Sequence, residues 1–289
     1  SIKKEMSEVE EKDWSQVLGY RLRKCFEELG PAFIKFGQLL SSREDIFDSS
    51  FIDEMKILRD RVKPIEFSVV KDEVEQSLGK SIEEVFDSVE ESPIGTASIG
   101  VVYKGTLKTG EKVVLKVRRP NIVKEMNTDF SILLFLATQV ERASEELKYL
   151  GISRLVNDFS ITLQTELDFH IEALNCERFK KNIEIHDKKK ILYIPKMYTE
   201  LCSERFLVME LLDGIPFSNK SGISPRLDEL KSNLTDALQI FIKTFLMDGF
   251  FHGDLHGGNF FLMKNDQIGI IDFGLMGRLS KKGRKKGRK

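Results

Sequence analysis

The segment FHGDLHGGNFFLMKNDQIGIIDFG, residues 251–274, constrains the fold more than any other part of the chain. Its two short apolar runs, NFFLM and QIGII, are separated by a turn at residues 264–266, a pattern that predicts a β-hairpin. Asp254 precedes the first run, Asn259 begins it, and Asp272 follows the second. A fold with this hairpin brings two carboxylates and an amide close to neighbouring strands.

The chain before Pro93 has helical periodicity. The segment GPAFIKFGQLLSS places Pro31 in a first helical turn, where its missing N–H does no harm. The expected apolar face comprises Phe33, Ile34, Phe36, Leu39 and Leu40. Lys35 and Gln38 project from neighbouring positions, and Gly37 between them costs about 1 kcal/mol relative to Ala. Either another group approaches this glycine closely, or a surface lysine and glutamine simply flank a packing position.

After Pro93 the periodicity changes from helix to strand. The stretch SPIGTASIGVVYKGTLKTGEKVVLKV predicts two strands joined by a turn near residues 109–110. A loop of mostly small residues precedes them, comprising Gly95, Thr96, Ala97, Ser98, Ile99 and Gly100. Small residues let backbone amides approach phosphate oxygens. Lys116 lies in the second strand among apolar neighbours, so it requires either a nearby anion or an exposed strand edge.

A long helical region follows, through residues 120–147 and 154–182. The apolar face expected in its second part comprises Leu155, Phe159, Leu163, Leu167, Ile171 and Leu174. Three acids, Glu166, Asp168 and Glu172, fall near that face, and the last two are helical neighbours that repel unless cations intervene. Lys116 and Lys35 are the expected cations. The alternative is a solvated acidic stripe.

Four further elements are predicted elsewhere in the chain. Residues 204–217 predict one apolar strand that ends at Asp213 and Gly214, where the chain can cross to another part of the fold. Residues 51–63 and the stretch after Pro64 predict helices. An amphipathic helix in residues 230–250 is expected to turn five residues inward: Leu234, Leu238, Phe241, Ile242 and Phe245.

Length and composition are those of an ordinary globular protein. The 289 residues are enough for one large or two small domains, and a net charge of −1 gives no field that favours nucleic acid. Three scattered cysteines are expected to be buried small hydrophobes in a reducing compartment. There is no signal peptide and no apolar run of about 18 residues, so no part of the chain is expected to span a bilayer.

The chemical groups follow one another in an informative order. Phosphoryl transfer needs a cover over the phosphates, a lysine on them, an acid that fixes the lysine, a carboxylate near the acceptor and metal ligands. The chain has a small-residue loop, a strand lysine, a helix glutamate, an HxD…N loop and DFG, in that order. Asp254 and Asn259 are five residues apart, the spacing of the kinase catalytic loop. Each part is weak evidence alone, but the order is typical of protein-kinase-like proteins.

Six motifs make the resemblance more specific: KFGQ, TASIG, VLKV, ELDFHIEALN, HGDLHGGN and DFG. The sequence resembles the UbiB/ADCK family of atypical kinases, which is associated with ubiquinone and other isoprenoid-quinone biosynthesis. The resemblance implies an α+β, bilobal protein-kinase-like fold with a helical KxGQ extension and a helical insertion in the N-lobe. The expected segments are 1–63 for the extension, 64–213 for the N-lobe and 214–289 for a truncated C-lobe.

The resemblance also implies roles for individual residues. The expected catalytic set is Asp254, Lys116 and Glu172, with Lys116 on the α- and β-phosphates of the nucleotide and paired to Glu172. The expected nucleotide-binding set is Gly95, Thr96, Ala97, Ser98, Ile99, Gly100, Lys116, Glu210 and Leu212. Asn259 and Asp272 are expected to bind Mg²⁺, with ATP or ADP as the cofactor. The expected lid over the site comprises Lys35 and Gln38 of KxGQ with Glu166 and Asp168 of the ExD pair.

Two features depart from the family pattern, one in the nucleotide loop and one in the catalytic loop. Gly95 and Gly100 stand where many relatives have alanine, which predicts a looser nucleotide loop, and Gly253 replaces the arginine of HRD kinases. Control by a phosphorylated activation loop is therefore not expected. The resemblance implies a cytoplasmic location, either peripheral to a membrane or anchored at it through segments outside this sequence, with anionic lipid and quinone-pathway enzymes as partners. The basic stretch SKKGRKKGRK is either a lipid contact or a solvated end.

Two other functions are compatible with the sequence. HGDLHGGN is similar to the corresponding loop of aminoglycoside and choline kinases, which phosphorylate small molecules but lack KxGQ. A nucleotide-gated scaffold for lipid-pathway enzymes, without catalysis, is the other alternative. Because the phosphate and metal positions are all present, turnover is favoured over binding alone.

Overall fold

The structure is a computed structural model that describes residues 14–58, 65–143, 148–149 and 151–279. Contacts divide the chain into two compact units. Unit 1 takes its described residues from Ser1–Glu66, Thr96–Gly100 and Arg119–Gln164. Unit 2 takes its described residues from Phe67–Gly95, Val101–Arg118 and Thr165–Lys289. The three-segment division expected from the motifs stays a prediction.

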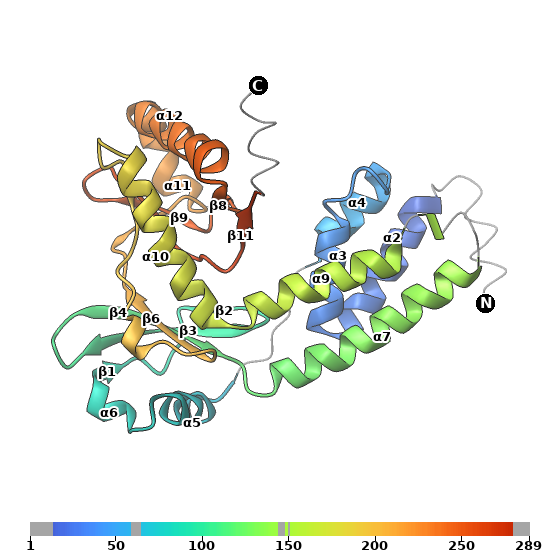
Figure 1. The fold of residues 1–289 in the computed structure, drawn as a ribbon, viewed down its shortest axis with the longest axis horizontal. Helices are drawn as coiled ribbons and strands as arrows, with labels where there is room; N and C mark the ends of the chain where they lie inside the picture. Colours follow the sequence, from blue (N-terminus) through green and yellow to red (C-terminus); the bar gives the residue numbers. More distant parts are fainter. Residues whose placement is uncertain (1–13, 59–64, 144–147, 150, 280–289) are drawn as a thin grey trace. The chain divides into compact units, whose positions relative to one another are not determined.

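Unit 1 is helical (Figure 1). Its helices are α2 (Trp14–Leu29), α3 (Pro31–Leu40), α4 (Ser49–Lys56), α7 (Ile122–Ala143) and all but the end of α9 (Ile152–Glu166). Its core is rich in phenylalanine: Phe36 packs against Phe159, and Phe159 in turn packs edge-on against Phe130 of α7. Within the described residues, no helix is both long and apolar enough to cross a lipid bilayer.

Helix α3 begins at Pro31, as predicted, and its apolar face is buried except for the half-buried Leu39. Gly37 lies against Phe26 and Leu58: a Cβ atom there would stand 2.3 Å from the Leu58 Cδ1 and 2.7 Å from the Phe26 Cδ2. The close approach expected from a glycine inside a helix is therefore confirmed. A side chain at this position would require Phe26 and Leu58, or α3 itself, to shift.

Unit 2 contains a five-stranded sheet of order β1-β3-β4-β6, with β2 paired to β3. The strands are β1 (Phe86–Val89), β2 (Gly95–Thr96), β3 (Gly100–Leu107), β4 (Lys112–Arg118) and β6 (Phe206–Glu210). Helix α5 (Phe67–Leu78) contacts β4, α6 (Ile82–Val85) lies beside α5, and α10 (Phe169–His186) contacts β6 (Figure 1). The predicted turn between β3 and β4 contains Gly110 with φ 96°.

The rest of unit 2 contains two smaller sheets. One has the order β5-β10-β9-β7, and the other pairs β8 with β11. Their strands are β5 (Leu192–Tyr193), β7 (Gly214–Pro216), β8 (Phe250–His252), β9 (Phe260–Met263), β10 (Ile268–Ile270) and β11 (Met276–Arg278). The helical elements are η1 (Thr199–Leu201), α11 (Lys220–Ile223), η2 (Ser224–Arg226), α12 (Leu227–Lys243) and η3 (Thr244–Asp248). Antiparallel pairing of β9 with β10 confirms the predicted hairpin.

The prediction of one continuous acidic helix is wrong, because the helix is interrupted at residues 167–168. Asp168 caps α10: its Oδ1 accepts the backbone N–H groups of His170 and Ile171 at 2.9 and 3.4 Å. Aspartate is a favoured N-cap because it satisfies N–H groups that have no partner within the helix. Asp168 and Glu172 are therefore not neighbours on one helix, and Leu174, expected inside, is 53% exposed.

Three other expectations need correction. The apolar run of residues 204–217 forms two strands, β6 and β7, in different sheets, because β6 ends at Glu210. On α12 the buried face comprises Leu230, Ala237 and Ile240, whereas Leu238 and Ile242 are exposed, as is Phe245 of η3. The predicted face is thus rotated about the helix axis. Of the cysteines, Cys176 is buried and Cys202 half-buried, but Cys25 is exposed on α2. The expected helical end of residues 51–63 lies outside the described residues beyond Leu58.

Candidate active site

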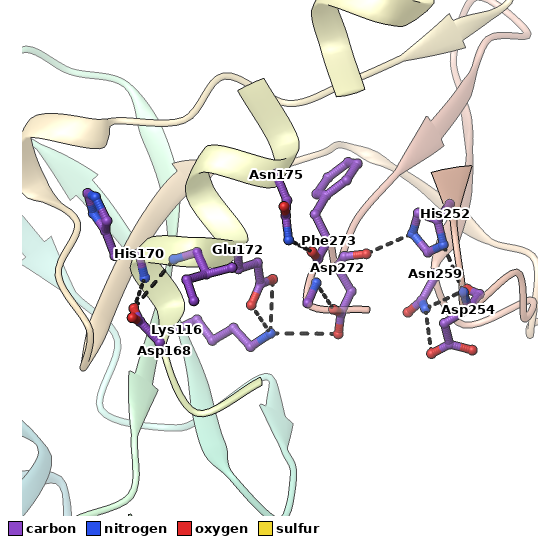
Figure 2. Close-up of polar contacts among 12 residues, drawn as sticks. Lys116, Asp168, His170, Glu172, Asn175, His252, Asp254, Asn259, Asp272 and Phe273 are labelled. Atoms are coloured by element: carbon purple, nitrogen blue, oxygen red, sulfur yellow. Dashed lines mark hydrogen bonds and ion pairs between the residues drawn. The ribbon is translucent and has the colours of Figure 1, made fainter. Parts of the chain in front are cut away.

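Lys116 lies on β4, between β3 and β6, and so is not on an exposed strand edge. Its Nζ donates to both carboxylate oxygens of Glu172, at 3.0 and 2.8 Å, and lies 3.6 Å from the Oδ2 of Asp272 (Figure 2). The ammonium group also stands over the ring of Phe169, 5.0 Å from its centroid. The strand lysine therefore meets anions, one from α10 and one from the turn after β10.

Burial and charge oppose each other in this cluster. Burial alone would lower the pKa of Lys116, but Asp272 and Glu172 outweigh it and raise the pKa above the ordinary lysine value. Burial raises the pKa of Glu172, and Lys116 opposes that rise. Only 3% of the Glu172 side chain is exposed, so its charge depends on the lysine. The ion pair therefore keeps Lys116 charged at the position where the phosphates are expected to bind.

Asp272 has a backbone conformation that residues other than glycine rarely adopt. Its φ is 63°, in the left-handed region, where a residue other than glycine is strained. The Oδ1 atom accepts the backbone N–H of Gly274 at 3.1 Å, and the backbone carbonyl of Asp272 contacts the Nε2 of His252 at 2.8 Å. The side chain is 45% exposed. Its carboxylate is therefore held by local bonds and accessible at the same time.

His252 connects the two acidic loops. Its Nδ1 accepts the backbone N–H of Asp254 at 3.1 Å, so the proton of the neutral ring is on Nε2, which donates to Asp272. Burial lowers the pKa of His252, and this favours the neutral ring. The sequence patterns did not indicate the bond to Asp272, because its acceptor is a backbone carbonyl, which every residue has.

The loop after β8 orients Asp254 and Asn259. The Nδ2 of Asn259 donates to the backbone carbonyl and the Oδ2 of Asp254, at 3.1 and 3.3 Å (Figure 2). Asn259 is buried, whereas the Asp254 side chain is 46% exposed and its Oδ2 lies 3.5 Å from the Nε2 of His256. Since the amide nitrogen of Asn259 is engaged, its carbonyl oxygen is the atom that can coordinate a metal.

The metal expected here fits the donors that the chain supplies. Among the residues that the structure describes, no three His, Cys, Asp or Glu side chains gather closely enough to hold a metal ion by themselves. Mg²⁺ typically takes one or two carboxylates and completes its shell with waters and nucleotide phosphates. Asp272, with the carbonyl oxygen of Asn259, is a donor set of that kind.

The expected nucleotide-binding loop is held by hydrogen bonds within its own backbone and from Arg119. The N–H of Ala97 donates to the carbonyl of Gly100 at 2.9 Å. Arg119 donates from its Nε to the carbonyl of Ala97 at 3.0 Å and from its backbone to Ile99 at 2.9 Å. Nothing in the sequence indicated this arginine. A Cβ added to Gly95 would lie 3.7 Å from Val102, an ordinary contact, so an alanine fits there.

Glu210 and Leu212 are expected to bind nucleotide; Glu210 ends β6, and Leu212 lies two residues further along the chain. The carboxylate of Glu210 accepts the hydroxyl of Tyr193 at 2.6 Å and the backbone N–H of Lys196 at 3.0 Å. The hydrogen bond to Glu210 raises the pKa of Tyr193 to about 12. Leu212 is buried beside Gly269, where a Cβ would stand 2.8 Å from its Cδ1. The Glu210 carboxylate is therefore already engaged by other groups of this chain, and its contact with a nucleotide stays a prediction.

The four expected lid residues are divided between the units. Lys35 and Gln38 belong to unit 1, where the Nε2 of Gln38 donates to the carbonyl of Leu58 at 3.4 Å. Glu166 ends α9 and Asp168 caps α10, both in unit 2. The pairing of Lys35 with either acid stays a prediction.

Comparison with known proteins places the fold in the kinase-like class. Rv3197 from Mycobacterium tuberculosis, solved as a complex with erythromycin, matches with a TM-score of 0.54 and 24% identity, over 96% of this chain and 68% of that chain. The ABC1 atypical kinase-like domain matches residues 57–289. The chain therefore belongs to the ABC1 family of atypical kinase-like proteins.

Curated relatives give the same result. Proteins named probable protein kinase UbiB are 37% identical over 270 residues in Shewanella piezotolerans and 35% identical over 274 residues in Sodalis glossinidius. These alignments cover 92% and 93% of this chain but 49% and 50% of the relatives. The resemblance to the UbiB/ADCK family is confirmed, and the chain spans about half the length of the curated relatives it matches.

Proposed function

We propose that this protein is a Mg²⁺- and ATP-binding atypical kinase or ATPase of the UbiB type. The observation that carries the proposal is the position of Lys116, whose ammonium group lies between the carboxylates of Glu172 and Asp272. A phosphate-binding lysine needs an acid that fixes it and a metal ligand nearby. The sequence order and the family membership support the same function.

In this proposal each residue has a distinct task. Lys116 binds the α- and β-phosphates while Glu172 holds its side chain in place. Asp254, whose side chain is about half-exposed, orients the attacking hydroxyl or water and accepts its proton. Asp272 and Asn259 hold Mg²⁺, which when bound neutralises the charge on the phosphates. His252 fixes the spacing of the two acidic loops through its bonds to both.

The biological role follows from the family rather than from the site. We propose that turnover supports isoprenoid-quinone or related lipid biosynthesis, at the cytoplasmic surface of a membrane, with anionic lipid and quinone-pathway enzymes as partners. The phosphoryl acceptor is not defined by the geometry. ATP hydrolysis, with water as the acceptor, needs no further binding site and is the simplest reaction that the proposed residues support.

Phosphate release from Mg-ATP, with and without anionic phospholipid vesicles, tests the proposal. The wild-type protein should release phosphate, and faster with vesicles, whereas Asp254→Asn should bind nucleotide but lose turnover. Asp53→Asn, an exposed change on α4, is the matched control and should keep full turnover. Nucleotide binding without turnover in the wild type, under both conditions, would instead indicate the non-catalytic scaffold.

A further inference from the structure

Asn175 lies on α10, three residues after Glu172, so the two side chains project from the same face of the helix. Its Nδ2 donates to the backbone carbonyl of Phe273 at 3.1 Å (Figure 2). This turn of α10 therefore holds the backbone of the residue that follows Asp272.

These contacts are buried, whereas the carboxylate they support is accessible. Asn175 is 5% exposed and Phe273 is fully buried, but the Asp272 side chain is 45% exposed. On its other side, the Asp272 carbonyl is bound by His252. A left-handed residue persists only where its surroundings determine its conformation. Here the surroundings are α10 on one side and the histidine on the other.

We propose that Asn175 is a positioning residue for the metal ligand Asp272. By holding the Phe273 carbonyl against α10, it keeps the Asp272 carboxylate where it can bind Mg²⁺ together with the nucleotide phosphates. Because Glu172 on the same helix positions Lys116, one helical turn sets both the lysine and the metal ligand. This inference rests on the proposed function and deepens it.

The chemistry of the position explains why an amide is needed. The Phe273 carbonyl is buried, so a side chain without a donor leaves it unsatisfied. A carboxylate at position 175 would stand beside Glu172 and repel both it and the carbonyl. Glutamine keeps the donor on a longer side chain. The expected order of function at this position is therefore asparagine, then glutamine, then alanine.

The test separates metal-dependent from metal-independent nucleotide affinity. The dissociation constant for ADP is measured by calorimetry in Mg²⁺ and again in EDTA, for the wild type, Asn175→Ala, Asn175→Gln and Cys176→Ala. Cys176 is the next residue of α10 and also buried, but its Sγ contacts the carbonyl of Pro195, so it is the matched control. Asn175→Ala should reduce the gain in affinity that Mg²⁺ provides by roughly five- to tenfold, the loss of one buried hydrogen bond.

A positioning role predicts that affinity in EDTA is unchanged in Asn175→Ala, that Asn175→Gln recovers part of the Mg²⁺ gain, and that Cys176→Ala changes neither value. An unchanged Mg²⁺ gain in Asn175→Ala, or an equal loss in Mg²⁺ and EDTA, overturns the proposal, since the second would indicate a purely structural role. Failure of the wild type to bind nucleotide overturns the proposed function itself.

Hydrogen exchange on the wild-type protein without nucleotide decides the matter where Asn175→Ala does not fold. The proposal expects the side-chain N–H protons of Asn175, which donate to the buried Phe273 carbonyl, to be protected from exchange. Fast exchange of these protons would show that α10 does not hold the turn, and the proposal would be wrong. This measurement depends on neither metal nor activity. It therefore distinguishes the absence of the Asn175–Phe273 hydrogen bond from a failure of the proposed function.

Discussion

The two sides of the candidate site differ in burial more than in chemistry. On the α10 side, Glu172 and Asn175 are at most 5% exposed, and each bonds to a partner far away in the sequence. On the other side are Asp254, in the loop after β8, and Asp272, in the turn after β10. Their carboxylates are 46% and 45% exposed. Both sides carry acids, but only one shields them from water.

This difference separates groups that organise the site from groups that react. A buried carboxylate is costly unless a cation faces it, so Glu172 and Lys116 depend on each other. A half-exposed carboxylate keeps contact with water, so Asp254 and Asp272 can exchange that water for a metal or an acceptor at small cost. The predictions below ask whether the buried side is in fact the stricter one.

The largest effect is expected from Lys116→Met. Removing the ammonium leaves a buried carboxylate without its cation, which should lower the free energy of unfolding by about 3–5 kcal/mol and abolish measurable ATP binding. Chemical denaturation and calorimetry measure the two effects. Lys264→Met removes the lysine of the exposed Lys264–Asp213 pair and should leave the free energy of unfolding close to that of the wild type.

The double variant Lys116→Met with Glu172→Gln sharpens this prediction. Each change removes the same contact, so the double variant should lose less unfolding free energy than the sum of the two single losses. The neutral amide of Glu172→Gln should recover part of the stability that Lys116→Met loses. Full additivity would show that Lys116 and Glu172 are energetically independent. The partner of the lysine would then be Asp272 or Glu166, whose charges also raise its pKa.

A smaller and more selective effect is expected from Asp272→Asn on the exposed side. The amide keeps the size of the side chain but removes the charge that faces Mg²⁺, so the Mg²⁺-dependent gain in ATP affinity should fall roughly a hundredfold. The unfolding free energy should stay close to that of the wild type, because the carboxylate is half-exposed. Thermal-shift titration with ATP and Mg²⁺ measures both. Undiminished stabilisation in the variant would contradict the metal assignment.

The sequence predicted best what local patterns determine. Both hairpins, the start of α3 at Pro31 and the packing role of Gly37 follow from turn residues, a proline and a glycine that act within a few residues. The break before α10 was missed because apolar spacing continues across residues 167–168 even though the backbone does not. A capping aspartate and an acidic helix residue look alike until the break is known.

Contacts between distant segments were beyond sequence patterns. Asn175 and Phe273 are 98 residues apart, and the accepting group is a backbone carbonyl that every residue has. The buried face of α12 was missed for a similar reason: several apolar stripes are available on that helix, and the packing of Leu230 against Ile223 and Leu262 selects one. Periodicity shows that a helix is amphipathic, but tertiary partners choose between adjacent faces.

The third prediction concerns the histidine that joins the two sides. Burial lowers the pKa of folded His252, so between pH 7 and pH 5 the unfolded chain takes up a proton that the folded protein resists. The stability due to neutral His252 is therefore present above the ordinary pKa of about 6.5 and lost as the pH falls below it, with a slope of at most about 1.4 kcal/mol per pH unit.

Chemical denaturation of the wild type and His252→Asn across this range isolates the contribution, because other titrating groups are common to both. The difference in unfolding free energy should shrink as the solution becomes more acidic. A difference that is constant with pH would show that His252 does not titrate with folding, and would remove the histidine as a neutral link between the Asp254 loop and the Asp272 turn.

The smallest effect is expected at the start of α10, where the buried side begins. Asp168→Ala removes the side chain that caps the N–H groups of His170 and Ile171, and should lower the unfolding free energy by about 1 kcal/mol. Asp168→Asn keeps the capping oxygen and should cost only a few tenths. Asp158→Ala, an exposed change on α9, is the control and should stay within about 0.5 kcal/mol of the wild type. If asparagine instead cost as much as alanine, the charge of Asp168 rather than its capping bond would matter, as it must if the residue pairs with Lys35.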